Sequence, residues 1–416
     1  MTRRQFVYSA GAAIPVLTAA VTQSSGTPWT QWGGPHRNFT TESKGLKASW
    51  PATGPRVIWK RPLGEGYSAP SVDSGVAYTM YGRPGEEVVV ALDANTGKTL
   101  WEHATPIGFR SDASGDMGNG PYASPLIAAD RVFTTGVAGR FQALDRKTGK
   151  EIWSQDLWAT HGGTRTMYGY ASSPLAYRDT IILPVGAKGK ATMAFRQSDG
   201  SVVWAKGNIP NAYVSPLMIS VDGLDQYVSV MDGSVFGLNP INGDLQWQVP
   251  WRADYGISCS MPVWCPGNLL FVSAEYNAGA KMIRLERKGQ QTNASEAWTS
   301  NRLRLHHGNA MWVNGSIYFT SGGKGSQAIL TAVDASTGKI HWQERSIAKA
   351  TFVWADGKLI TLDQDGNLML AFPSPQGFRV ISKAELLTNL SWTPPVLVGT
   401  RLYIRDRRNI MAVDLS

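Results

Sequence analysis

The repeat that decides the fold reads Ala91-Leu92-Asp93-Ala94-Asn95-Thr96-Gly97-Lys98-Thr99-Leu100-Trp101. The same pattern recurs along the chain, closely in two segments and more weakly in four. The close copies span 143–153 and 332–342, the weaker ones 194–204 and 237–247, and the degraded ones 284–298 and 371–380. An eighth first half lies at 412–414, and the matching second half lies far upstream, at 57–59.

Each copy has the residue pattern of a β-hairpin. An apolar strand ends at an acidic or amide residue, whose side chain can hydrogen-bond the following turn. The second strand carries a Trp at a fixed distance, which we expect to pack between neighbouring units. Another strand pair precedes the hairpin, as at 71–78 and 126–133, so each unit contains four short strands. The positive φ that closes the turn is expected at a shared glycine: Gly97, Gly149, Gly200, Gly243 and Gly338.

The spacing of the copies predicts the architecture. Their acidic-position anchors stand at 93, 145, 196, 239, 286, 334, 373 and 414, which are 39 to 52 residues apart. A four-stranded propeller blade takes about 40–50 residues. A strand near the N-terminus that completes the C-terminal blade would leave no open sheet edge. The sequence therefore predicts an all-β fold, one eight-bladed β-propeller over residues 56–416, in preference to a flat β-sandwich.

The composition agrees with short strands and tight turns. The 416 residues include 44 Gly and 16 Trp, and only 17% are charged. Two cysteines exclude a disulfide scaffold, a four-cysteine zinc site and an iron–sulfur cluster. The net charge of +9 comes from scattered basic residues, whereas nucleic-acid binders concentrate theirs in a stripe. We therefore expect no nucleic-acid partner, and a monomer.

The first twenty residues resemble an export signal. Arg3 and Arg4 precede a short apolar run rich in small residues, which is too short to span a bilayer comfortably. The arginine pair is similar to that of a twin-arginine signal, although a chance pair on another export signal or an uncleaved anchor remains an alternative. The expected organisation is a signal peptide at 1–20, a lead-in segment at 21–55 and the propeller. The mature chain is then periplasmic or extracellular, with no integral membrane segment.

The Ala-Leu-Asp-x-x-Thr-Gly-Lys-x-x-Trp hairpin resembles the repeat of the pyrroloquinoline-quinone (PQQ)-like propellers, the quinoprotein alcohol dehydrogenase-like superfamily. A matching Ser-Pro element on the inner strands is clear at Ser124-Pro125, Ser173-Pro174 and Ser215-Pro216 and weaker elsewhere. The lead-in from Trp29 to Arg37 also resembles the segment before the propeller in exported bacterial members. This resemblance covers about residues 29–416 and implies the fold more strongly than an activity.

The resemblance implies two classes of function. Some members are periplasmic dehydrogenases that hold PQQ and calcium at the propeller centre, and others are non-catalytic and act in protein assembly. Alcohol-oxidising members share an adjacent cysteine pair, whereas Cys259 and Cys265 are six residues apart here. We expect two buried free thiols, although a disulfide is conceivable if the chain folds back near Pro262. The favoured function is a non-catalytic binding scaffold in the cell envelope, and a PQQ-dependent dehydrogenase is the alternative.

Metal and catalytic motifs are weak. Calcium would need converging oxygens, for which the candidates are Asp112 with Asp116 and Asn119, Glu275 with Asn277, and Asp363 with Asp365. Solvated turn residues are the favoured interpretation of all three groups. His306 and His307 are adjacent, so they are poor joint metal ligands unless the loop turns. We therefore commit to no catalytic residue and no metal site.

The best candidate site is an aromatic and cationic collar. Several tyrosines precede the inner strands by three or four residues, where propeller connections surround one mouth of the central channel. Such a collar could bind a planar anionic ligand, a sugar or a peptide, although the rings could instead pack between blades. The candidate rim residues are Tyr67, Arg110, Tyr122, Arg165, Tyr170, Tyr213, Arg304, His306 and Trp392.

Overall fold

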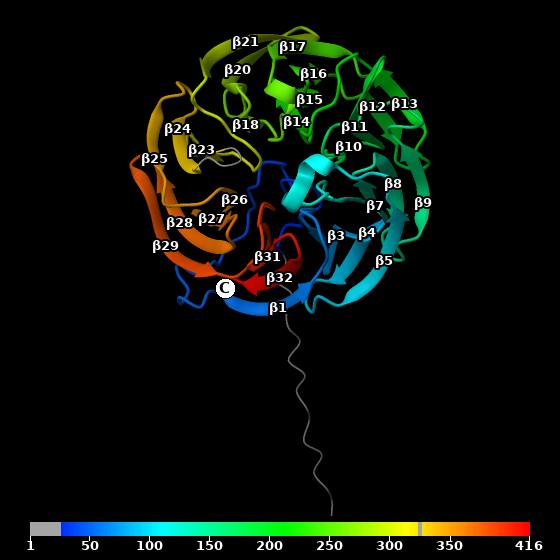
Figure 1. Cartoon of the computed structure of the whole chain (residues 1–416). Coiled ribbons are helices and arrows are strands. Elements are labelled where there is room, and N and C mark those ends of the chain that lie inside the picture. Colours follow the sequence, from blue (N-terminus) through cyan, green and yellow to red (C-terminus); the bar gives the residue numbers. More distant parts are fainter. Residues whose placement is uncertain (1–25, 323–326) are drawn as a thin grey trace, which may run out of the picture.

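A computed structural model describes residues 26–322 and 327–416, apart from the side chains of Asp112, Asp116 and Met117. The expected signal peptide at 1–20 lies outside these residues. Eight four-stranded antiparallel sheets form a closed ring, which confirms the eight-bladed propeller (Figure 1). No helix in the described part of the chain is long and apolar enough to cross a membrane.

Blades 1 to 4 each run from an inner to an outer strand in chain order. Blade 1 contains β2 (Ser71–Asp73), β3 (Val76–Arg83), β4 (Glu86–Asp93) and β5 (Thr99–Pro106); blade 2 contains β6 (Leu126–Ala128), β7 (Arg131–Thr135), β8 (Arg140–Asp145) and β9 (Glu151–Asp156). Blade 3 contains β10 (Leu175–Tyr177), β11 (Thr180–Ala187), β12 (Lys190–Arg196) and β13 (Val202–Lys206); blade 4 contains β14 (Leu217–Val221), β15 (Leu224–Met231), β16 (Gly233–Leu238) and β17 (Leu245–Trp251).

Blades 5 to 7 continue in the same order, and blade 8 joins distant parts of the chain. Blade 5 contains β18 (Val263–Cys265), β19 (Leu269–Ala274), β20 (Gly279–Lys288) and β21 (Gln291–Ser300); blade 6 contains β22 (Met311–Val313), β23 (Ser316–Ser321), β24 (Ile329–Asp334) and β25 (Ile340–Glu344). Blade 7 contains β26 (Ala350–Ala355), β27 (Lys358–Asp363), β28 (Asn367–Ser374) and β29 (Gly377–Glu385); blade 8 contains β30 (Val396–Val398), β31 (Arg401–Arg405), β32 (Asn409–Asp414) and, outermost, β1 (Arg56–Pro62).

The repeated residues have specific structural roles. The Asp93 carboxylate accepts hydrogen bonds from the backbone N–H groups of Asn95 and Thr96, which hold the turn between β4 and β5. The small Ala91 lies opposite Trp101 at a β-bulge, and the same pairing of a small residue with Trp recurs in most blades. The indole of Trp101 then crosses to blade 2, where its Nε1 donates to the carbonyl oxygen of Arg146 at 3.1 Å. The repeat thus encodes both the hairpin and the contact between neighbouring blades.

Serine and threonine side chains connect the inner strands around the axis. The hydroxyl of Ser71 donates to the carbonyl oxygen of Pro125, and that of Ser172 donates to Val214. Where the Ser-Pro pattern fails, Asn309 exchanges two hydrogen bonds with the backbone of Phe352. The inner ring is therefore hydrogen-bonded around the axis, which fixes the position at which each connection between blades enters an inner strand.

The lead-in segment from residue 26 crosses the end of the channel that is opposite the connections between blades. Trp29 pairs with Val72 of blade 1, and Phe39 accepts a hydrogen bond from Trp354 of blade 7. Arg37 is 3% exposed, and its guanidinium donates to the carbonyl oxygens of Pro174 and Pro216. Because these contacts reach blades on several sides of the axis, the segment closes this end of the channel.

Candidate functional site

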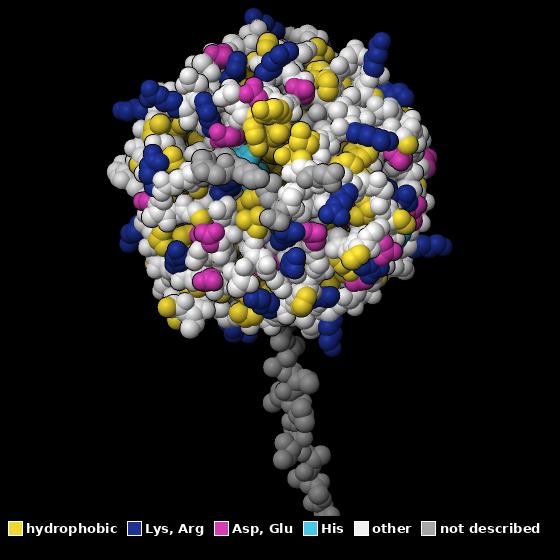
Figure 2. Space-filling view, viewed as in Figure 1, with side chains coloured by type: hydrophobic (Ala, Val, Ile, Leu, Met, Phe, Trp, Pro, Cys, Tyr) yellow, Lys and Arg dark blue, Asp and Glu magenta, His cyan; other side chains and the backbone are white. Residues whose placement is uncertain are grey.

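A cavity of about 230 Å³ lies at the open end of the channel, where the outer strand of one blade connects to the inner strand of the next. Half of its lining residues carry aromatic rings. The lining consists of Trp32, Tyr67, Ser114, Gly118, Tyr122, Tyr168, Ala171, Ser173, Tyr213, Ser215, Ile257, Cys259, Tyr276, His306, His307, Gly308, Trp392 and Pro394. Figure 2 shows hydrophobic side chains gathered beside a histidine near the centre of this face.

Five candidates from the sequence line the cavity: Tyr67, Tyr122, Tyr213, His306 and Trp392. The ring of Tyr67 stacks against two of them, with centroid distances of 6.1 Å to Tyr122 and 5.5 Å to Trp392. Burial raises the pKa of the Tyr122 and Tyr213 hydroxyls to about 12, so both are neutral hydrogen-bonding groups at neutral pH.

Tyr170 does not line the cavity. It is 1% exposed, and its hydroxyl donates to the carbonyl oxygen of Pro184 at 2.9 Å. Its ring belongs to the hydrophobic core of blades 2 and 3. Tyr170 therefore packs between blades, which was the alternative to a position in the collar. Tyr168, two residues earlier, lines the cavity instead and lies 5.8 Å from the ring of Tyr213.

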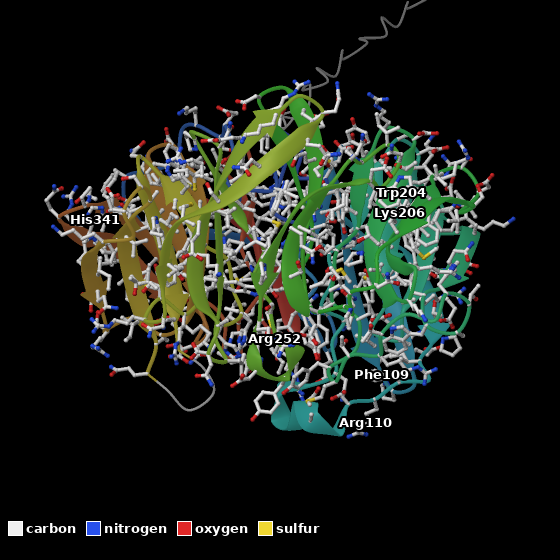
Figure 3. All side chains as sticks on the ribbon, turned by 90° about the horizontal axis from the view of Figure 1, so that it is seen from above. Phe109, Arg110, Trp204, Lys206, Arg252 and His341 are labelled. Carbon is white, nitrogen blue, oxygen red and sulfur yellow. The ribbon has the colours of Figure 1, made fainter. Side chains whose placement is uncertain are left out.

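The three arginine candidates lie outside the cavity lining. Arg110 and Arg165 are exposed, and Arg165 lies over the ring of Trp158. Arg304 is partly buried, and its Nε donates to the carbonyl oxygen of Asn301. Figure 3 shows Arg110 and Arg252 at the same end of the molecule, opposite Trp204 and Lys206. The arginines therefore belong to the outer rim.

His306 is held from both sides. Its Nδ1 lies 2.9 Å from Nζ of Lys349, and its Nε2 lies 2.8 Å from the hydroxyl of Tyr276. An ammonium group only donates, so Nδ1 accepts and the ring proton on Nε2 is donated to Tyr276. Burial and the nearby charge of Lys349 lower the pKa of His306 to about 3, and burial lowers the pKa of Lys349 to about 8. At neutral pH a neutral imidazole therefore connects an ammonium group to a tyrosine.

His307 lies beside this network. Its ring centroid is 4.1 Å from that of His306 and 3.9 Å from that of Trp392. Its buried Nε2 has no hydrogen-bond partner among the described residues. Both histidines line the cavity because they lie in a connecting loop, where the alternation expected of a strand does not apply.

Several residues of the site were not among the sequence candidates, and four of them shape it most. Trp32 comes from the lead-in segment, Tyr168 lies beside the chosen Tyr170, and Tyr276 lies in the turn between β19 and β20. Lys349 immediately precedes β26, in a connection that lacks the Ser-Pro element. Only Tyr168 shared a signal with the chosen residues, since it stands in the same tyrosine-bearing connection.

The residues present do not fit PQQ with calcium. Calcium takes carboxylate, amide and carbonyl oxygens, but the lining holds no carboxylate or amide side chain among those described. Both cysteines are free thiols; Cys259 lines the cavity, and Cys265 is buried in the core of blades 5 and 6. Within the described part of the chain, no three His, Cys, Asp or Glu side chains could hold a metal ion. The structure does not describe the side chains of Asp112 and Asp116, which are two of the calcium candidates.

The comparisons with known proteins give one family, and the relatives include both assembly factors and dehydrogenases. A family model described as outer membrane protein assembly factor BamB matches residues 85–344. The Yersinia pestis protein of that name is 25% identical over 300 residues, which cover 70% of this chain and 73% of that protein. A quinohemoprotein alcohol dehydrogenase from Pseudomonas putida is 27% identical over 158 residues, which cover 36% of this chain and 21% of that enzyme.

Solved structures from both groups share the fold. BamB from Moraxella catarrhalis superposes with a TM-score of 0.60 at 14% identity, covering 87% of this chain and 100% of that one. A europium-containing methanol dehydrogenase superposes with a TM-score of 0.67 at 15% identity, covering 91% and 89%. At these identities the likeness concerns the fold alone.

Proposed function

The chain belongs to the family described as outer membrane protein assembly factor BamB, and we propose that it is an exported, non-catalytic propeller that binds a partner protein in the cell envelope. The proposal includes cleavage of the twin-arginine-like signal at 1–20, a periplasmic location and a monomeric chain. The binding surface is the cavity face.

The chemistry of the cavity is the observation that carries this proposal. Burial raises the pKa of the Cys259 thiol to about 12, which leaves the sulfur protonated and a poor nucleophile at neutral pH. Both nitrogens of His306 are engaged, and its low pKa makes it a weak base. A cavity of aromatic walls with neutral polar groups suits binding better than it suits acid–base or nucleophilic catalysis.

The experiment compares two faces of the molecule with one photo-crosslinking amino acid. Met167 is 53% exposed beside Tyr168 at the cavity face, and Ile241 is 55% exposed in the turn between β16 and β17 at the opposite end. We expect a discrete protein adduct in cells from position 167 and none from position 241. Equal adducts from both positions, or an adduct from position 241 alone, would contradict the proposal.

A parallel measurement tests the dehydrogenase alternative. Purified protein is incubated with PQQ and calcium while the absorption spectrum and thermal melt are recorded. A ligand that binds only the folded chain must raise its apparent stability. A spectral change with a raised melting temperature and alcohol oxidation would support the dehydrogenase and overturn the non-catalytic assignment.

A further inference from the structure

We propose that the cavity face recognises an acidic peptide segment of its partner, one tyrosine side chain of which enters the cavity and accepts a hydrogen bond from Tyr276. This inference rests on the proposed function and specifies the chemistry of the partner. Three features carry it: the size of the cavity, the orientation of the Tyr276 hydroxyl and the charge of the rim.

The size of the cavity favours a single side chain. Pockets for drug-sized ligands typically enclose about 300–1,000 Å³, and this cavity encloses about 230 Å³. Its lining includes the stacked rings of Tyr122, Tyr67 and Trp392, together with Trp32 from the lead-in segment. Aromatic walls favour an aromatic occupant, which gains offset-stacked or edge-to-face contacts.

The Tyr276 hydroxyl provides one directed donor. Its oxygen already accepts the proton of His306 Nε2, and His306 is oriented by the ammonium group of Lys349 on its other side. The hydroxyl proton of Tyr276 is therefore available to an acceptor in the cavity, and the chain of hydrogen bonds that ends in a cation strengthens that donor. A phenol oxygen on the occupant accepts this bond, whereas the ring of a phenylalanine does not.

The rim supplies the positive charge. Arg110, Arg165, Arg252 and Arg304 come from four different connections, and none forms an ion pair with another described residue. Of the acidic residues at this end, Glu65 is engaged by Arg407 and Asp254 by Asn277. Glu275 beside Tyr276 and Asp232 beside Gly256 form no ion pair with a described residue, so the four arginines share the rim with these two carboxylates. Exposed apolar area also flanks the cavity, at Tyr255 (82% exposed) and Met167. Arginines around an aromatic cavity complement a peptide with carboxylates on both sides of its aromatic residue.

The test measures binding of synthetic peptides to the full mature chain by fluorescence anisotropy. The reference peptide has two acidic residues on each side of a tyrosine, and three variants carry phenylalanine or alanine at the centre or lysines at the flanks. We expect the alanine and lysine variants to bind at least tenfold more weakly. Equal binding of the alanine variant would overturn the single-side-chain anchor, and equal binding of the lysine variant would overturn the acidic flanks.

Tyr276→Phe tests the donor separately. We expect it to weaken the tyrosine peptide about fivefold to tenfold, the loss of roughly one hydrogen bond, and to leave the phenylalanine peptide unchanged. Tyr177→Phe is the matched control, since Tyr177 lies at the opposite end of blade 3 and bonds Asp225. An equal effect of Tyr276→Phe on both peptides would contradict the donor role. Thermal melts of both variants establish that they fold.

Two further outcomes separate this inference from the proposed function. If no peptide binds while the adduct at position 167 persists, the acidic tyrosine anchor is wrong and the binding face remains. If no peptide binds and no adduct forms at position 167, the acidic tyrosine anchor and the proposed binding face are both wrong. If free 4-hydroxyphenylacetate binds as tightly as the reference peptide, the occupant is a small aromatic acid and the peptide proposal is overturned.

Discussion

The indole ring of Trp101 lies directly against Gly149 of the next blade, so closely that a Cβ added at Gly149 would overlap the ring. The same arrangement joins Trp59 to Gly97, Trp153 to Gly200 and Trp298 to Gly338. Trp247 is an exception, since its Nε1 donates to Gln226 of its own blade. The glycine of the repeat therefore has two roles. It adopts the positive φ that closes the turn, and its lack of a Cβ leaves room for the Trp ring of the preceding blade.

Gly149→Ala tests this contact. We expect a loss of roughly 2–4 kcal/mol in unfolding free energy, because the new methyl group combines overpacking with a strained positive φ. Gly189→Ala is the matched control: its φ is 72°, close to the 71° of Gly149, but nothing lies within 4 Å of the added Cβ. Urea unfolding of the two variants separates packing from strain, and equal losses would contradict a packing role for Gly149.

Arg37→Ala tests whether the lead-in segment is an integral part of the fold. Removing the guanidinium leaves the carbonyl oxygens of Pro174 and Pro216 without their donor, so we expect a loss of roughly 2–4 kcal/mol. Arg56→Ala removes a largely exposed ion pair with Asp414 and should cost less than about 1 kcal/mol. Similar losses in both variants, measured by urea unfolding, would show that Arg37 contributes no more than a surface charge.

Glu87 predicts a pH-dependent stability. This residue of β4 is 8% exposed beside blade 2, and burial raises the pKa of its carboxyl group to about 7, above the ordinary value of 4.5. Its contribution to stability is therefore complete below about pH 4.5 and is lost as the pH rises through 7. We expect Glu87→Gln to gain stability relative to the native chain over that range, by roughly 1–3 kcal/mol in total.

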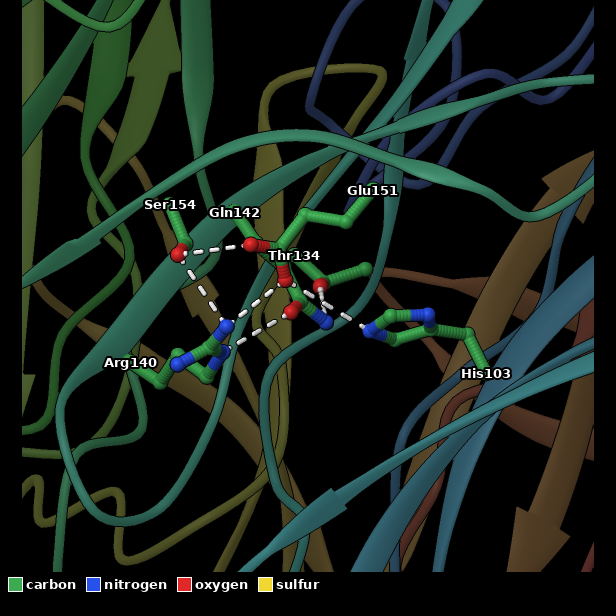
Figure 4. Close-up of polar contacts among 6 residues, drawn as sticks. All are labelled: His103, Thr134, Arg140, Gln142, Glu151 and Ser154. Carbon is green, nitrogen blue, oxygen red and sulfur yellow. Dashed lines mark hydrogen bonds and ion pairs between the residues drawn. The ribbon is translucent and has the colours of Figure 1, made fainter.

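The control for Glu87 is Glu86→Gln, on the same strand but paired with Arg83 at the surface. Its stability relative to the native chain should change little between pH 5 and 8. A neighbouring cluster is also titratable, since Glu151 is bonded by Arg140 and Ser154 and lies 3.6 Å from His103 (Figure 4). Neither substitution changes a residue of this cluster, so the comparison with Glu86→Gln isolates the effect of Glu87. If Glu87→Gln shows no pH-dependent gain, the carboxylate is ionised in the folded protein and the account of its burial is wrong.

His306 predicts the opposite dependence. Its folded pKa of about 3 lies below the ordinary value of 6.5, so its contribution is present above pH 6.5 and is lost as the pH falls towards 3. His306→Gln should destabilise the chain by roughly 1–3 kcal/mol at pH 7, through the lost bonds to Lys349 and Tyr276. The penalty should shrink at pH 5, as followed by urea unfolding, and a constant penalty would contradict a buried neutral imidazole.

The sequence predicts the fold because the same physical constraint acts at each blade. Asp93, Gly97 and Trp101 each have a local role in the turn or in the contact with the next blade, and the pattern repeats those roles. Even the long hairpin of β20 and β21, where the pattern is degraded, keeps the bulge beside Trp298. Ring closure follows from the pairing of β1 with β32.

The site was predicted only in part, because no repeat specifies the cavity. Tyr67, Tyr122 and Tyr213 were found from their position before an inner strand, whereas Tyr170 occupies a similar position and turns into the core. Trp32 reaches the cavity through the path of the lead-in segment, which no local pattern encodes. The bond between His306 and Lys349 joins residues 43 positions apart, so it depends on the ring as a whole.

The most direct test of a binding cavity is to fill it while recording the adduct at position 167 in cells. Ala171 lines the cavity, and Ala176 on β10 lies outside it, so Ala171→Trp and Ala176→Trp form a matched pair. With both variants folded, we predict that Ala171→Trp abolishes the adduct and that Ala176→Trp preserves it. An undiminished adduct in Ala171→Trp would contradict the claim that the partner enters the cavity.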